Sequence, residues 1–472
     1  MRRMGRTIIR GGTVVTASDT FAADVWIENG KIAALAQPLA TGMAYGPDDV
    51  TYDATGQYVM PGGIDCHTHM AMPFGGTTAS DDFYTGTVAA AHGGTTTIVD
   101  FAIQSKGTSM RSGLDAWLAK AEGQVAGDYS LHMIMTEANA QTLEDMAAMV
   151  REGITSFKMF MAYPGVFLVD DQQIFRAMQR AGELGALITM HAEIGLPIDV
   201  IVQQALAAGR TAPIYHALTR PEVAEATGTE RAIALAEMAG VPVYMVHLSA
   251  QRALERVMEA RDRGLPVFAE TCPQYLFLSE DDLRGDPDDE FAGAKFVATP
   301  PLRKAHHHEH LWRGLRNYDL QVVATDHCPF CMKDQKELGR GNFSKIPNGM
   351  PGVETRMHLL WDGVRTGKIS MNRFVEITAT APAKIFGMYG RKGTLAIGAD
   401  ADVVIWDPKL EKILSDKTLH MRVDYSPYEG RKVIGAPSHV FSRGELLVKD
   451  DVWVATTKRG RGQFIKRGTF SL

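Results

Sequence analysis

Short apolar runs recur through the middle of the chain, between about residues 58 and 391. Runs of this length, bounded by turn residues, predict β-strands. Several intervals between them have helical spacing, since Ile174, Met178 and Ala181 share one helix face and Leu254 and Val257 share another. The runs that we assign to strands are Ile64–His69, Thr96–Phe101, Ser130–Met135, Ser156–Phe160, Leu187–His191, Val243–His247, Val267–Thr271 and Gln321–Asp326.

Eight strands that alternate with helices predict an α/β protein built on a (β/α)₈ TIM barrel. In this fold the active site lies at the carboxyl ends of the strands. A doubly wound open sheet is the alternative arrangement of the same pattern. The barrel is favoured because no glycine-rich dinucleotide-binding motif follows the first strand.

The two ends of the chain have the pattern of β-structure. Asn29-Gly30 lies between two apolar runs, which is the strongest local signal for a β-hairpin. Strand-like runs return near residues 401–406 and 440–448. We therefore expect a second, smaller β-domain formed from both chain ends. The expected bounds are residues 1–57 and 391–457 for the small β-domain, 58–390 for the catalytic barrel and 458–472 for a basic tail that makes subunit contacts.

Composition and charge limit the class of partner. The 472 residues are 45% hydrophobic and carry a net charge of −6, which argues against binding to nucleic acid or to an anionic membrane surface. No apolar run approaches the roughly 18 residues that a membrane span requires. The basic start is not followed by the apolar segment of a signal peptide. We expect a cytoplasmic protein that acts on a small molecule.

Side chains of the kinds that bind metals stand at the ends of the predicted strands. His67 and His69 close the first strand, and residues two apart in a strand point to the same face. Because all strands of a barrel end at one rim, side chains at these positions should converge. The other members of the set are Lys158, His191, His247 and Asp326. The sequence therefore predicts a metal site at the mouth of the barrel.

Lys158 differs from the other five residues, because an ammonium group beside two divalent cations is electrostatically unfavourable. A neutral amine can instead add CO₂ to form a carbamate, whose oxygen atoms can bridge two metals. If the site binds two metals, we expect this modification at Lys158. The other interpretation is a structural lysine with a buried stem and a paired charge.

Longer motifs around these residues resemble the amidohydrolase superfamily, and more narrowly the dihydropyrimidinase (D-hydantoinase) family. The resemblance extends over almost the whole chain. The segments that carry it are Gly63–His69, Phe157–Tyr163, His191–Glu193, Val246–Ser249, Thr299–Arg303, Ala324–His327, Lys345–Gly349 and Gly398–Asp407.

The resemblance implies two Zn²⁺ ions per subunit, although Mn²⁺ and Co²⁺ suit the same ligands. It implies that Tyr163 stabilises an oxyanion, and that main-chain groups at Thr299 and Asn348 bind the ring amides of the substrate. The family often has Ser at position 299, and it has Asn where this chain has Ile194. A homotetramer is also implied. The implied ligand sets are His67, His69, Lys158 and Asp326 for one ion, and carbamylated Lys158, His191 and His247 for the other, with a hydroxide between them.

The segment after His69 indicates which ring is bound. In relatives that act on dihydroorotate, an arginine follows closely and holds the substrate carboxylate, whereas Met70–Phe74 is apolar and uncharged here. An unpaired carboxylate in such a site costs several kcal/mol, so neutral rings are favoured. Met70, Phe74 and Phe160 are candidates for the pocket around the exocyclic group.

We therefore expect hydrolysis of the cyclic amide bond of 5,6-dihydropyrimidines or 5-substituted hydantoins to N-carbamoyl amino acids. A metal-bridging hydroxide would be the nucleophile, and Asp326 would carry its proton to the leaving nitrogen. Allantoinase is the nearest enzymatic alternative. A non-catalytic scaffold of the same fold, like the vertebrate collapsin-response mediator proteins, is the other. Those proteins have lost metal ligands, so retention of all six positions favours an enzyme.

Two further groups have metal-binding residue types without the expected placement. Cys328 and Cys331 form a C-x-x-C pair, but no second pair completes a zinc site, so reduced thiols are expected. The histidine-rich segment 306–310 precedes a predicted helix, away from any strand end, and is expected to be structural.

Overall fold

The computed structural model describes residues 6–37, 46–457 and 459–470. Its centre is an eight-stranded parallel sheet in the order β17-β16-β15-β14-β13-β12-β11-β8. A parallel bridge between Thr68 and His327 joins the two edges and closes the barrel. The strands are β8 (Gly63–Thr68), β11 (Thr95–Gln104), β12 (Asp128–Met135), β13 (Ser156–Phe160), β14 (Leu187–His191), β15 (Val243–Met245), β16 (Val267–Thr271) and β17 (Val322–Val323).

The barrel expected from the sequence is confirmed, and each predicted strand coincides with one of its members. Two strands are shorter than predicted. β15 stops before His247 and β17 stops before Asp326, and both residues have left-handed backbone, with φ angles of 38° and 53°. A residue in that region cannot continue a β-strand, so these two side chains stand on turns just beyond their strands.

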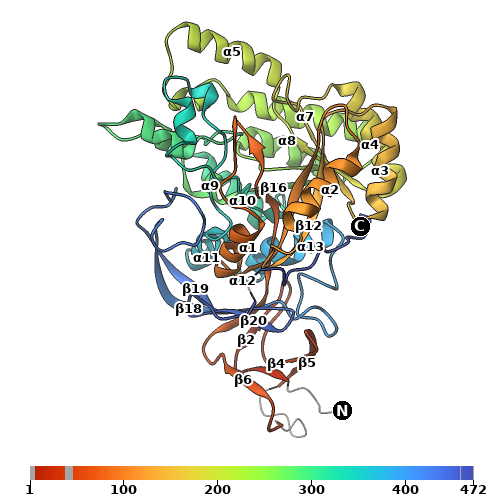
Figure 1. The fold of residues 1–472 in the computed structure, drawn as a ribbon, viewed down its shortest axis with the longest axis vertical. Coiled ribbons are helices and arrows are strands. Elements are labelled where there is room, and N and C mark those ends of the chain that lie inside the picture. The colour runs from red at the N-terminus through yellow and green to blue at the C-terminus, as the bar shows by residue number, and fades with distance from the viewer. Residues whose placement is uncertain (1–5, 38–45, 458, 471–472) are drawn as a thin grey trace.

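Helices surround the strands, as Figure 1 shows. α4 illustrates their construction: the Asp170 side chain accepts the N–H of Gln173 at its start, and Gly185 ends it with a φ of 64°. Ile174 and Met178 are buried on its inner face. The α-helices are α1 (Phe83–His92), α2 (Met110–Ala121), α3 (Ala140–Arg151), α4 (Asp171–Leu184), α5 (Gly195–Ala207), α6 (Ile214–Leu218), α7 (Glu222–Ala239), α8 (Gln251–Asp262), α9 (Pro273–Phe277), α10 (His307–Arg316), α11 (Arg356–Arg365), α12 (Met371–Val375) and α13 (Ala381–Ile385).

Short 3₁₀ and π turns complete the loops. They are η1 (Glu280–Arg284), η2 (Glu290–Phe296), η3 (Lys336–Gly339), η4 (Phe343–Lys345) and the π-helical η5 (Glu376–Thr380). No helix of the described residues is both long and apolar enough to cross a lipid bilayer.

Two further sheets form a β-domain at the end of the molecule opposite α5 (Figure 1). One has the order β5-β4-β1-β6, and the other has the order β21-β20-β19-β18-β7-β2-β3 and combines strands from both chain ends. The predicted hairpin at Asn29-Gly30 is confirmed, because Glu28 pairs with Lys31 across it. The strands are β1 (Thr7–Arg10), β2 (Thr13–Val15), β3 (Thr20–Ala22), β4 (Asp24–Glu28), β5 (Lys31–Ala36), β6 (Val50–Asp53), β7 (Tyr58–Pro61), β18 (Val403–Leu414), β19 (Arg431–Ser442), β20 (Glu445–Lys449) and β21 (Val452–Trp453).

One segment at an expected domain bound pairs with the other domain. The segment Tyr58–Pro61, assigned above to the barrel, pairs with β18 and β2 and belongs to the β-domain sheet. The basic tail packs on its own barrel over residues 459–470: the N–H of Ile465 donates to the Tyr129 carbonyl, and that of Phe470 to the Gly185 carbonyl. Residues 458, 471 and 472 lie outside the described residues, and subunit contacts of the tail stay a prediction.

Candidate metal centre

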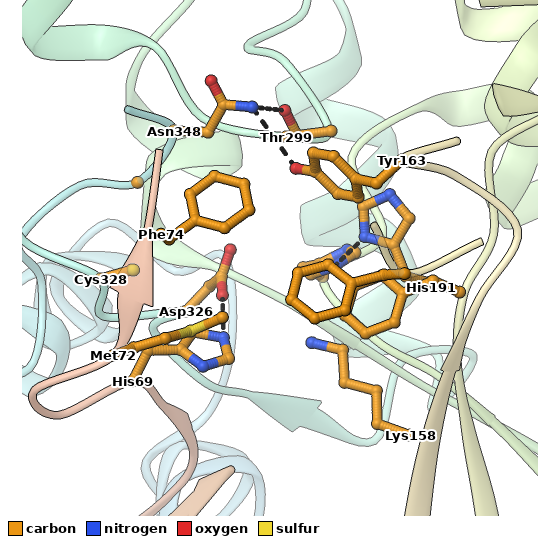
Figure 2. Close-up of a pocket in the computed structure, with 14 residues that line it drawn as sticks. His69, Met72, Phe74, Lys158, Tyr163, His191, Thr299, Asp326, Cys328 and Asn348 are labelled. Carbon is orange, nitrogen blue, oxygen red and sulfur yellow. Dashed lines mark hydrogen bonds and ion pairs between the residues drawn. The ribbon is translucent and has the colours of Figure 1, made fainter. Parts of the chain in front are cut away.

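The six predicted metal-binding residues meet at the carboxyl ends of the barrel strands, and all six are buried. Five of them line one end of a cavity, and His67 contacts Lys158 behind it. Figure 2 shows His69, Asp326, Lys158 and His191 pointing toward one another across its floor. His247 lines the same cavity.

Three of these side chains form one cluster of donor atoms. Nε2 of His67 and Nε2 of His69 lie 3.2 Å and 3.1 Å from Oδ1 of Asp326. These ligand atoms are all within 4.8 Å of one another. Nζ of Lys158 is 2.8 Å from Nε2 of His67, which places the amine beside this cluster.

The second cluster lies beside the first. Nδ1 of His191 and Nε2 of His247 are 3.0 Å apart, and the rings of His67 and His247 lie 5.3 Å apart. Converging imidazole nitrogens with a carboxylate oxygen are a donor set suited to Zn²⁺ and to similar divalent ions. The residues therefore fit a metal centre.

Two buried carboxylates orient the imidazole rings. Oε1 of Glu270 contacts Nδ1 of His67, and Oε2 of Glu193 lies 2.9 Å from Nε2 of His191. A carboxylate at one ring nitrogen keeps the proton there and leaves the lone pair of the other nitrogen for a metal. Glu270 also accepts hydrogen bonds from the Tyr244 hydroxyl and from the N–H of His247.

The sequence alone did not indicate a role for either carboxylate. Glu193 lies in the motif that begins with His191, and Glu270 lies inside an apolar strand. A role for Glu270 could have been inferred only from its position, because it is a carboxylate close to the carboxyl end of the seventh barrel strand.

Burial sets the protonation states of the centre. It lowers the pKa of Lys158 to about 8, close enough to neutrality for the amine form to be populated. Burial also raises the pKa of Asp326, but His67, His69 and Lys158 outweigh that effect and bring it to about 2. Asp326 is therefore ionised at neutral pH. Burial raises the pKa of Glu270 to about 7.

The backbone is strained at three residues of the site. His247, Asp326 and Tyr163 have φ angles of 38°, 53° and 62°. Left-handed backbone costs a non-glycine residue roughly 1–3 kcal/mol, and such residues cluster at functional sites. The surrounding fold holds these side chains in positions that an unstrained turn would not give.

Tyr163, Thr299 and Asn348 form the opposite wall of the cavity (Figure 2). Nδ2 of Asn348 donates to Oγ1 of Thr299 at 2.8 Å and to the Tyr163 hydroxyl at 3.4 Å. Burial raises the pKa of Tyr163 to about 12. Its hydroxyl is therefore a hydrogen-bond donor at neutral pH.

The apolar wall of the cavity differs from the expected one at a single position. Phe74 and Phe160 line the cavity, as expected, and Phe167 stacks on both. Met70 does not line it: its side chain is buried against Gly86 in the barrel core. Ala71, with a φ of 49°, turns the chain, and Met72 lines the cavity instead.

The other candidate groups do not form comparable sites among the described residues. Cys328 and Cys331 are free thiols. In the histidine-rich segment, Nδ1 of His307 accepts the N–H of Gln251, a structural contact. His92 and His420 lie near Asp451, but their rings are stacked 3.4 Å apart, so that no ion can lie in both ring planes.

Comparison with known proteins agrees with this geometry. Residues 58–447 match the model of the amidohydrolase family. The chain is 58% identical over 468 residues to a D-hydantoinase of Streptomyces coelicolor, and 49% identical over 465 residues to a D-hydantoinase of Geobacillus stearothermophilus. The first alignment covers 98% of both chains, and the second covers 98% of this chain and 97% of the relative.

Solved structures are similar over the same length. The crystal structure of dihydropyrimidinase from Brevibacillus agri superposes with a TM-score of 0.96 at 50% identity, covering 99% of this chain and 100% of the other. A structure titled L-hydantoinase (dihydropyrimidinase) from Arthrobacter aurescens is more distant, with a TM-score of 0.87 and 29% identity, and it covers 98% of this chain and 99% of the other.

The orienting role of Glu270 gives a first prediction. Glu270→Gln removes the carboxylate that contacts Nδ1 of His67. Metal affinity should therefore fall by about 10- to 100-fold. Competition with a chromophoric chelator measures the dissociation constant. Glu259→Gln makes the same change on the surface and serves as the control. Equal affinity in Glu270→Gln and the control would show that Glu270 does not support the centre.

Proposed function

Because the chain belongs to the amidohydrolase family, we propose that it hydrolyses neutral cyclic ureides. The substrates are 5,6-dihydropyrimidines or 5-substituted hydantoins. Water breaks the bond between a ring carbonyl and a ring nitrogen, which gives an N-carbamoyl amino acid. One observation carries the proposal: the same cavity has metal-type ligands on its floor, hydrogen-bonding groups on one wall and aromatic side chains on another.

Two divalent ions, Zn²⁺ or the similar Mn²⁺ and Co²⁺, suit the donor set. When bound, such ions would activate a water molecule at neutral pH and would polarise the carbonyl of the substrate. Lys158 would join the two clusters as a carbamate. Its burial, its pKa of about 8, its contact with His67 and its charge effect on His247 support this. The ligands would be His67, His69, Lys158 and Asp326 for one ion and Lys158, His191 and His247 for the other.

Asp326 would move the proton. Its pKa of about 2 keeps it ionised, so it can accept a proton from the attacking water. One carboxylate oxygen contacts His69, and the other points away from it toward the cavity (Figure 2). From there the proton can pass to the ring nitrogen as the amide bond breaks, which avoids expulsion of an unprotonated amide anion.

Tyr163 would act on the carbonyl oxygen of the scissile amide bond. Its hydroxyl is protonated at neutral pH, and a donor aimed at a developing oxyanion stabilises the transition state more than the ground state. Main-chain groups at Thr299 and Asn348 would bind the amides of the ring. The side chains of these two residues are already hydrogen-bonded to each other.

The apolar wall supports a neutral substrate. No arginine lines this cavity within the part of the chain that the structure describes. Phe74, Phe160, Phe167 and Met72 provide apolar surface for an exocyclic group instead.

A homotetramer is part of the proposal, and light scattering would test it.

Steady-state rates on dihydrouracil, hydantoin, 5-phenylhydantoin, allantoin and dihydroorotate test this function. We expect kcat/KM for the best neutral ring to exceed that for dihydroorotate by about 10² or more, because burial of an unpaired carboxylate costs several kcal/mol. Allantoin as the best substrate would indicate an allantoinase. Activity on none of these rings, together with fewer than about one metal ion per chain, would favour a non-catalytic scaffold.

Loss of the Tyr163 hydroxyl should lower the rate of the chemical step. We expect kcat of Tyr163→Phe to fall by about 10², with a smaller change in KM. Tyr318→Phe removes a hydroxyl from an exposed side chain and is the matched control. If Tyr163→Phe kept the wild-type kcat, oxyanion stabilisation by Tyr163 would be wrong.

A further inference from the structure

Lys336, at the start of η3, is a fully buried lysine that the proposed mechanism does not use. Its Nζ donates three hydrogen bonds, all to backbone carbonyls: to Val297 at 3.0 Å, to Pro347 at 2.8 Å and to Gly349 at 2.8 Å. Three bonds use every donor of an ammonium group. No carboxylate pairs with Lys336 within the described parts of the chain.

The three carbonyls belong to the two segments that contain Thr299 and Asn348, the residues whose main-chain groups are proposed to bind the substrate. Pro347 and Gly349 flank Asn348, and Val297 lies two residues before Thr299. The N–H of Gly349 also donates to the Val297 carbonyl at 3.0 Å. The two segments are therefore joined on the cavity side by the bond between Asn348 and Thr299, and behind the cavity by Lys336.

A lysine is costly to bury at this position. A buried ammonium without a counter-ion loses its hydration, and here the three carbonyls replace the lost water. The three carbonyls stabilise the ammonium charge only while they point toward Nζ. The ammonium in turn fixes the orientation of these carbonyls, and therefore of the peptide groups on either side of Asn348.

We infer that Lys336 is a positioning residue for the substrate, which holds the main chain at Asn348 and Thr299 in the orientation that binds the ring amides. The inference rests on the proposed ring-opening function. Lys336 lines no part of the cavity that holds the metal-type ligands, so it acts through these two segments and not by contact with the ring.

The protonation of Lys336 gives this role a pH dependence. Burial lowers the pKa of Lys336 to about 7. The titratable groups that face it are Cys328 and His216. Burial raises the pKa of the Cys328 thiol and lowers that of the His216 imidazole, so both are neutral near pH 7. As the pH rises through about 7, the amine keeps two donors for three carbonyls, and substrate binding should weaken.

The test compares Lys336→Met with Lys333→Met, which removes an exposed lysine of the same loop. We measure kcat and KM for the best neutral ring, together with metal content and Tm. Loss of a charged donor to these segments should raise the KM of Lys336→Met by about tenfold while kcat stays within about threefold. Lys333→Met should keep the wild-type values.

The outcomes separate this inference from the proposed function. A wild-type protein without ring-opening activity would overturn both. An active, metal-loaded Lys336→Met with a KM within about twofold of wild type would overturn the inference alone. If Lys336→Met does not fold, the wild-type enzyme decides: its KM should rise between roughly pH 6 and pH 8.5, and a flat profile of KM over that range would contradict the inference.

Discussion

All eight strands of the closed parallel sheet end at the same rim, and the position of every candidate ligand depends on this constraint. Lys158 and His67 are 91 residues apart in the chain, yet their nitrogens lie 2.8 Å apart. His69 and Asp326 are separated by 257 residues and meet at 3.1 Å. No local turn or helix could assemble this set, so the candidate ligands come together only when the barrel is closed.

Closure also removes the rim residues from water, and the remaining features of the site follow from that. Buried imidazoles need defined partners, and Glu270 and Glu193 supply them. A buried amine loses part of its preference for the charged form, which brings Lys158 toward the neutral state that reacts with CO₂. Lys336 is also a buried amine removed from water, and backbone carbonyls take the place of a counter-ion there.

Much of this architecture could be predicted from the chain alone, because strand period and strand ends are local patterns. The eight barrel strands and the convergence of His67, His69 and their partners follow from such patterns. Features that depend on tertiary packing could not be predicted from the sequence. Glu270 sits within an apolar strand, and the turn at Ala71 exchanges Met70 for Met72 at the cavity. The role of Lys336 depends on carbonyls 11 to 39 residues away, which no sequence pattern marks.

In the proposed centre, carbamylated Lys158 would join two metal ions at the barrel rim. Metal analysis can test this role with the wild-type protein and Lys158→Ala, each loaded with Zn²⁺ in the presence of bicarbonate. We expect about two ions per chain in the wild type and fewer than about one in the variant. Two ions retained by Lys158→Ala, or a wild-type metal content that does not change when bicarbonate is removed before loading, would contradict it.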